Sequence, residues 1–131
     1  MTPQEWKEVQ AALELLYTPV NLNCDGYKVT LALMRTNQFR NAIRIYINGV
    51  IKGKWYIEDC EERRRFFRPI TKSMLSPKSK AALKKLSKKR KLELETEYKY
   101  TYYVPEWNSF AALKRHFIKN NNSIELIRKG V

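Results

Sequence analysis

The first apolar positions of the chain recur at steps of three and four residues, the spacing that places side chains on one face of an α-helix. This stripe consists of Trp6, Val9, Leu13 and Leu16. Thr2 can cap the helix start, Pro3 suits the first helical position, and Glu5 can complete a capping box. Because Pro19 blocks continuation, we expect this helix to end soon after Tyr17.

From residue 20 to residue 57 the hydrophobic period changes to two, which is typical of β-strands. The dipeptides Asp25-Gly26 and Asn48-Gly49 interrupt the alternation and suit hairpin turns. We therefore expect four antiparallel strands in this stretch. One face of the second strand is apolar and consists of Tyr27, Val29, Leu31 and Leu33.

The register around Asn48 decides which side chains of the last two strands share a face. A two-residue turn would place Ile51 and Trp55 in water. A bulged three-residue turn containing Gly49 aligns both of them with the apolar face of the preceding strand, and we expect this turn. The opposite face then carries basic and aromatic side chains, namely Arg44, Tyr46, Lys52, Lys54 and Tyr56.

The middle of the chain predicts two further helices. Residues 58–67 favour a short helix with two ion pairs four positions apart. These pairs are Asp59 with Arg63 and Glu61 with Arg65. A loop over residues 68–76 leads to Ser76 and Pro77, a cap and first-position pair that opens a helix through about Arg90.

The C-terminal part of the chain predicts a strand, a helix and a last short strand. Residues 93–104 alternate in polarity, and we expect the tyrosines on one side of this strand to lie in the core. These tyrosines are Tyr98, Tyr100 and Tyr102. A helix follows, capped by Asn108 or Ser109, and residues 124–127 form the last strand. The buried stripe of that helix is Phe110, Leu113 and Phe117.

Together these elements predict an α+β fold with one domain over residues 1–131. An antiparallel sheet, formed by the hairpins and the two C-terminal strands, packs against the N-terminal and C-terminal helices. The basic helix that begins at Pro77 lies at the edge. One domain is expected because two separate cores would each be very small in a chain of this length.

Charge sharpens this picture, because it is concentrated in one segment. The chain has 26 Lys and Arg against 13 Asp and Glu, a formal net charge of +13. Residues 63–91 contain 13 bases and no acid, so the rest of the chain is formally neutral. Such local crowding destabilises a compact fold by self-repulsion and exceeds what solubility requires.

The acid-free segment predicts a surface for the phosphate backbone of DNA or RNA, because lysine and arginine release condensed counterions from phosphates. Its expected phosphate contacts are Arg63, Arg64, Arg65, Arg68, Lys78, Lys84, Lys85, Lys88, Lys89 and Arg90. The basic sheet face is a second expected surface, on which tyrosines stack on bases and cationic groups contact phosphates. Its residues are Arg44, Tyr46, Lys52, Lys54 and Tyr56. The structural alternatives are a solvated basic helix and a sheet face covered by a helix.

A metal-dependent nuclease is a distant alternative. Glu97-Tyr98-Lys99 is an E-x-K pattern on a predicted strand, and carboxylate and lysine groups can hold a cation and act near an attacking water. The match is short, and the acids upstream of it are expected to pair with arginines. His116 is the only histidine, so neither a histidine-based triad nor a cluster of histidine ligands can form. We therefore expect no catalytic residue, no metal and no cofactor.

The remaining expectations concern the partner and the location. A competing interpretation is a small regulator or inhibitor of the kind that phages and mobile elements carry, which binds an acidic protein or a nucleoprotein complex. No apolar run approaches the roughly 20 residues that span a membrane, so we expect a cytoplasmic, nucleoid-associated or nuclear protein with no membrane partner. Cys24 and Cys60 are 36 positions apart without a CxxC pattern, which favours free, buried thiols.

Overall fold

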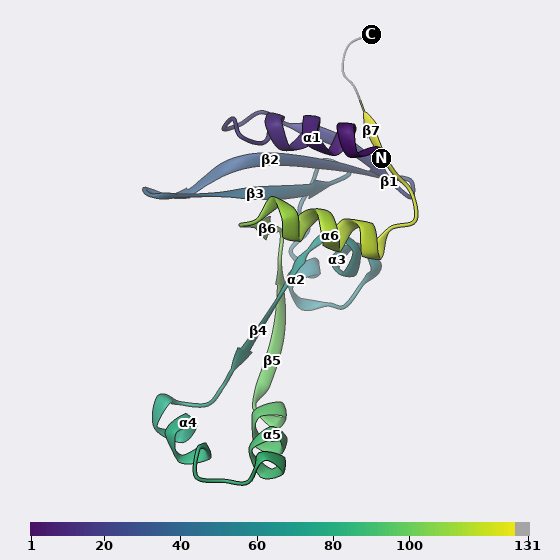
Figure 1. Ribbon diagram of the computed structural model, residues 1–131. Helices are drawn as coiled ribbons and strands as arrows, with labels where there is room; N and C mark the ends of the chain where they lie inside the picture. The colour runs from purple at the N-terminus through teal and green to yellow at the C-terminus, as the bar shows by residue number, and fades with distance from the viewer. Residues whose placement is uncertain (128–131) are drawn as a thin grey trace. The chain divides into compact units, whose positions relative to one another are not determined.

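The computed structural model describes residues 1–127 and divides the chain into two compact units, whose ribbon is drawn in Figure 1. We call Met1–Arg68 with the chain from Tyr103 onward the sheet unit, and Pro69–Tyr102 the basic unit. The sheet unit contains α1 (Pro3–Ala12), β1 (Val20–Cys24), β2 (Tyr27–Asn37), β3 (Arg40–Ile47), α2 (Lys54–Ile57), α3 (Glu61–Phe66), β6 (Glu106–Trp107), α6 (Phe110–Asn120) and β7 (Ile124–Ile127). The basic unit contains α4 (Pro77–Leu83) and α5 (Lys88–Glu97), and the paired strands β4 (Arg68–Ser73) and β5 (Lys99–Val104) lead into and out of these helices.

The sheet unit is built on a five-stranded antiparallel sheet with the strand order β6-β3-β2-β1-β7. In the register of its central strands, Val29 pairs with Leu22 on β1, and Leu31 pairs with Ile45 on β3. All four of these side chains are fully buried. Strands from the first hairpin and from the C-terminus therefore share one sheet, which confirms the expected α+β class.

The helices at the two ends of the chain pack into the core of this sheet. Thr2 and Glu5 form the predicted capping box of α1, with the Thr2 hydroxyl accepting from the Glu5 amide and the Glu5 carboxylate accepting from the Thr2 amide. The rings of Trp6 on α1 and Phe110 on α6 pack in a T-shaped arrangement, with 6.2 Å between ring centroids. The predicted cap of α6 at Ser109 is also confirmed. Both terminal helices thus contribute to one hydrophobic cluster.

The prediction of a fourth strand in the hairpin run is wrong. Asn48 and Gly49 both have positive φ angles, of 53° and 82°, and form a two-residue turn in which Ile47 and Val50 exchange backbone hydrogen bonds of 3.0 and 3.2 Å. After this turn the chain forms α2, which leaves Ile57 82% exposed. The free edge of β3 pairs with β6 instead, so the edge expected to hold the fourth strand is filled from the far end of the sequence.

The predicted loop over residues 68–76 and the helix expected to run to Arg90 also differ from the structure. Residues 68–73 form β4. Ser76 caps α4 as predicted, but this helix ends at Leu83, and Ser87 caps a second helix with its hydroxyl accepting from the Arg90 amide. α5 continues through Glu97, where a strand was predicted. Alternating leucine and glutamate imitates a strand pattern, yet both residue types favour helix.

The tyrosine row expected in the core is largely exposed. The side chains of Tyr98 and Tyr100 are 40% and 44% exposed, and Tyr102 is half-buried. None of the three belongs to the hydrophobic cluster, which consists only of residues of the sheet unit. Tyr103, the next residue of β5, packs against that cluster. The basic unit therefore presents aromatic rings to solvent.

Candidate nucleic-acid interface

The four arginines between residues 63 and 68 make contacts within the sheet unit. Arg63 is only 9% exposed, and its guanidinium lies 3.9 Å from the centroid of the Tyr103 ring. Its Nε atom has no hydrogen-bond partner among the described residues. The predicted ion pair between Arg63 and Asp59 is wrong, because Asp59 pairs with Arg64 through both carboxylate oxygens.

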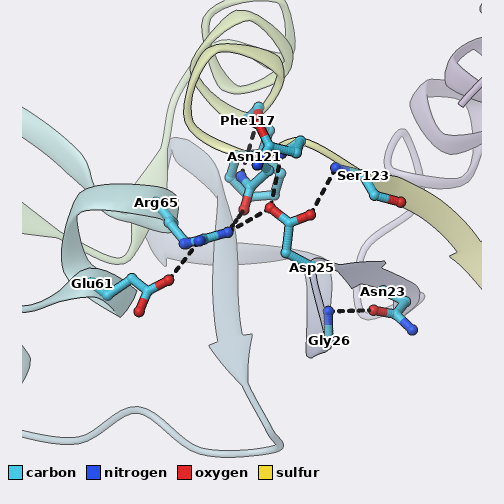
Figure 2. A network of polar contacts seen from close by, with 9 residues as sticks. Asn23, Asp25, Gly26, Glu61, Arg65, Phe117, Asn121 and Ser123 are labelled. Atoms are coloured by element: carbon cyan, nitrogen blue, oxygen red, sulfur yellow. Dashed lines mark hydrogen bonds and ion pairs between the residues drawn. The ribbon is translucent and has the colours of Figure 1, made fainter.

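Arg65 is held by a network that joins three parts of the sheet unit, as Figure 2 shows. Its guanidinium donates to the Asp25 carboxylate at 2.6 Å and to the Asn121 side chain at 3.2 Å. The predicted pair with Glu61 is present. Asp25 lies in the turn between β1 and β2, and Arg65 lies on α3, so the network ties this turn to the helix.

The Asp25 carboxylate also accepts hydrogen bonds from the backbone of the segment between α6 and β7. The Asn122 amide donates to Oδ2 and the Ser123 amide to Oδ1, each at 2.8 Å. The bond from Asn122 contributes most to lowering the pKa of Asp25, and the bonds from Arg65 and Ser123 add to it, against the opposing effect of desolvation. Arg65 and Asp25 therefore fix tertiary structure.

The last arginine of this group and the predicted basic sheet face also make contacts within the sheet unit. Arg68 donates from Nε to the backbone oxygen of Glu106 at 2.9 Å. Arg44 forms an ion pair of 3.0 Å with the Glu106 side chain. Of the other members of the predicted face, Tyr46 lies on the same strand as Arg44, and Lys52, Lys54 and Tyr56 lie beyond the turn at Asn48 and Gly49. Tyr46 is half-buried on β3, Lys52 follows the turn, and Lys54 and Tyr56 are exposed on α2.

The two charged residues of the E-x-K pattern lie on different elements. Glu97 ends α5 and Lys99 begins β5, so the E-x-K pattern does not lie along one strand. His116 lies 2.9 Å through Nε2 from the backbone oxygen of Arg64, and burial lowers its pKa. Burial raises the pKa of the Cys24 thiol to about 12. Among residues 1–127, no three His, Cys, Asp or Glu side chains gather as metal ligands would.

The basic unit concentrates exposed cationic side chains in a short segment. Its 34 residues include ten lysines or arginines against three glutamates, a formal excess of seven positive charges. These bases are Lys72, Lys78, Lys80, Lys84, Lys85, Lys88, Lys89, Arg90, Lys91 and Lys99. All are exposed except the half-buried Lys91. Within residues 69–102, all of which the structure describes, none of these bases forms an ion pair with a carboxylate.

Four of these lysines surround one cavity of the basic unit. This cavity, which we call the lysine pocket, has a volume of 340 Å³. It is lined by Ser73, Leu75, Lys80, Lys84, Lys91, Glu95 and Lys99. Only Lys84 belongs to the contacts expected from the sequence. The other three lysines lie on α4, α5 and β5, which meet at this cavity. The sequence pattern predicts one long helix and one strand here, so it does not indicate that these lysines come together.

A second cavity of the basic unit is apolar. It has a volume of 590 Å³, and we call it the apolar groove. Its lining consists of Met74, Leu75, Ser76, Ser79, Ala82, Leu83, Leu86, Leu94 and Tyr98. Leu75 lines both cavities, so the groove adjoins the lysine pocket. Leu83 is the one buried residue within residues 69–102, and the side chains of Met74 and Leu86 remain 68% and 41% exposed.

Neither membrane insertion nor kinship with known proteins indicates a function. Over the residues that the structure describes, no helix is both long enough and apolar enough to cross a membrane. Comparison of the chain with models of protein families, with curated proteins and with solved structures found no significant match.

Proposed function

We propose that this protein binds nucleic acid without catalysing a reaction on it, and that the basic unit makes the phosphate contacts. The observation that carries the proposal is the convergence of Lys80, Lys84, Lys91 and Lys99 on one cavity that holds a single carboxylate, that of Glu95. The bases of this unit form no ion pair with a carboxylate. Ammonium groups that lack internal partners are available to phosphates, and each contact releases condensed counterions. Such an activity belongs in the cytoplasm or at a nucleoid or nucleus.

The engagement of the arginines in the sheet unit narrows the expected contact set. Removing Arg65 from Asp25, or Arg63 from the ring of Tyr103, would break contacts that stabilise that unit. A buried or paired arginine is therefore a poor phosphate ligand, whereas an exposed lysine needs no rearrangement. We assign the phosphate contacts to the lysine pocket and to the exposed bases Lys78, Lys85, Lys88, Lys89 and Arg90.

The test is fluorescence anisotropy with labelled DNA and RNA at about 50 and 200 mM salt. If six to ten phosphates are bound, affinity falls by roughly 10³ to 10⁵ between these conditions. Replacing the four lysines of the pocket by glutamine lowers the slope of log affinity against log salt by about 0.7 to 0.9 for each phosphate that is no longer neutralised.

A matched control removes the same number of charges from the sheet unit. Its changes are K7Q, R35Q, R40Q and K119Q, all at exposed positions outside the basic unit. We expect this control to retain the affinity and the salt slope of the unmodified protein. Failure to bind either polymer at about 50 mM salt would overturn the proposal. If the protein instead forms a complex with another protein and that complex survives nuclease treatment, an acidic protein partner is favoured.

A further inference from the structure

The two cavities of the basic unit differ in chemistry and are adjacent, because Leu75 lines both. The lysine pocket is lined by four lysines and one glutamate and is therefore cationic, and the apolar groove is lined by leucine, methionine and tyrosine side chains. A ligand that fills both must carry negative charge beside an uncharged, largely apolar group. A nucleotide has this composition, because its phosphate is charged and the faces of its base are apolar.

The groove has the properties of a site for such a group. Its volume of 590 Å³ falls within the range of ligand pockets, which are mostly apolar with a few polar groups. The hydroxyls of Ser76 and Ser79 supply those polar groups and lie 3.0 Å from each other. Tyr98 contributes an aromatic ring that is 40% exposed. In a duplex both faces of each base are covered by its neighbours, so only an unpaired base can enter.

The two-stranded sheet of β4 and β5 adds a second aromatic surface. The rings of Tyr100 and Tyr102 on β5 stack, with centroids 6.0 Å apart and planes inclined by 25°. The ammonium of Lys72 on β4 lies 5.7 Å from the centroid of the Tyr102 ring. Exposed aromatic rings beside cationic groups are what proteins use to bind single strands, because every base has a face that can stack.

We propose that the basic unit selects single-stranded nucleic acid, with a base in the apolar groove, its phosphate in the lysine pocket and further bases on the ring pair of Tyr100 and Tyr102. The inference rests on the proposed function, since it names the form of nucleic acid that the same unit binds. An acidic peptide could also match lysines beside leucines. The partly exposed stack of Tyr100 and Tyr102 favours planar bases over the aliphatic side chains of a peptide.

The experiment compares three DNA ligands of about 12 nucleotides, a length within the range of known single-strand sites. They are a labelled oligothymidylate, a duplex, and an abasic strand that keeps the phosphates and lacks all bases. At about 50 mM salt we expect the oligothymidylate to bind at least about tenfold more tightly than the other two, because each stacked base stabilises the complex. Oligouridylate serves as the RNA counterpart.

Variants assign this preference to the two surfaces. Met74→Gln with Leu86→Gln places amides in the groove, and Tyr100→Ala with Tyr102→Ala removes the stacked rings. Each pair is expected to lower affinity for oligothymidylate about tenfold and to leave affinity for the abasic strand unchanged. Amide hydrogen exchange in α4 and α5 checks that the basic unit remains folded, because an unfolded cationic segment would also bind the abasic strand. Phe39→Ala, which removes an 89% exposed ring from the sheet unit, is the matched control and is expected to change neither affinity.

The outcomes separate this inference from the proposed function. Equal affinity for the abasic strand and the oligothymidylate, or for the duplex, overturns the single-strand inference while nucleic-acid binding stands. Absence of binding to all three ligands overturns both. If polyglutamate displaces the oligothymidylate as effectively as an excess of unlabelled oligothymidylate does, the cavities select negative charge alone, and the single-strand inference is wrong.

Discussion

Arg65 and Lys84 are both cations of the acid-free segment, and the structure gives them different surroundings. Arg65 donates to two side chains and faces two carboxylates. Lys84 forms no ion pair and lines a cavity with three other lysines and Glu95. The sequence can count these charges but cannot tell them apart. The partners of Arg65 are Asp25 and Asn121, which lie 40 and 56 positions away along the chain, so only folding brings them together.

Asp25 offers a test of this division at the level of one side chain. Asn tolerates a positive φ, so Asp25→Asn keeps the turn and removes the charge. Because the pKa of Asp25 is lowered in the folded state, its carboxylate stabilises the fold above the usual aspartate pKa of about 4, and this contribution is lost as the pH falls through the folded pKa.

We therefore expect D25N to be less stable than the unmodified protein at pH 7, and the difference to shrink as the pH is lowered below about 4. Urea unfolding across this range measures the difference. A stability gap that stays constant with pH would contradict the assigned role of the Asp25 charge. Nucleic-acid affinity at pH 7 is expected to be unchanged, because the network lies in the sheet unit.

Elements whose signals are local could be predicted, and elements that depend on distant partners could not. The caps at Thr2, Ser76 and Ser109 confirm three helix starts, because a cap bonds to residues only three positions away. The prediction of a fourth strand is wrong because β6, from a distant part of the chain, pairs with β3 in its place. The sequence does not predict the lysine pocket for the same reason, because its pattern indicates one helix and one strand where the structure has α4, α5 and β5.

Ser87 gives the prediction at this scale, because its hydroxyl caps the helix that the sequence pattern concealed. Ser87→Ala is expected to destabilise α5 by about 1 kcal/mol, the usual cost of losing such a cap. Amide hydrogen exchange measures the effect. We expect faster exchange in the first turns of α5 and unchanged exchange in α6. Thr96→Ala, an exposed change late in α5, is the control and is expected to have the opposite sign. Unaltered exchange in α5 of S87A would show that the cap is unimportant.

At the scale of the whole molecule, the excess positive charge is divided between the two units, whereas the sequence places all of it in the acid-free segment. The acid-free segment crosses the boundary between the units, since its bases up to Arg68 belong to the sheet unit and its bases from Lys72 onward to the basic unit. Counted by unit, the basic unit carries seven of the thirteen excess charges. The sheet unit has the hydrophobic cluster and paired arginines, so we infer that it serves as the stable part of the protein.

The measurement that tests this account most directly replaces residues 74–98 by Asn-Gly. The Met74 amide donates to the Tyr98 oxygen at 2.7 Å, so the two strands are close enough there for a hairpin turn to join them. No residue of the replaced segment belongs to the hydrophobic cluster. We expect a cooperative thermal transition to be retained, and affinity for single-stranded DNA at about 50 mM salt to fall at least roughly a hundredfold. A folded variant that binds DNA as tightly as the full chain would contradict the claim that the basic unit is the nucleic-acid site.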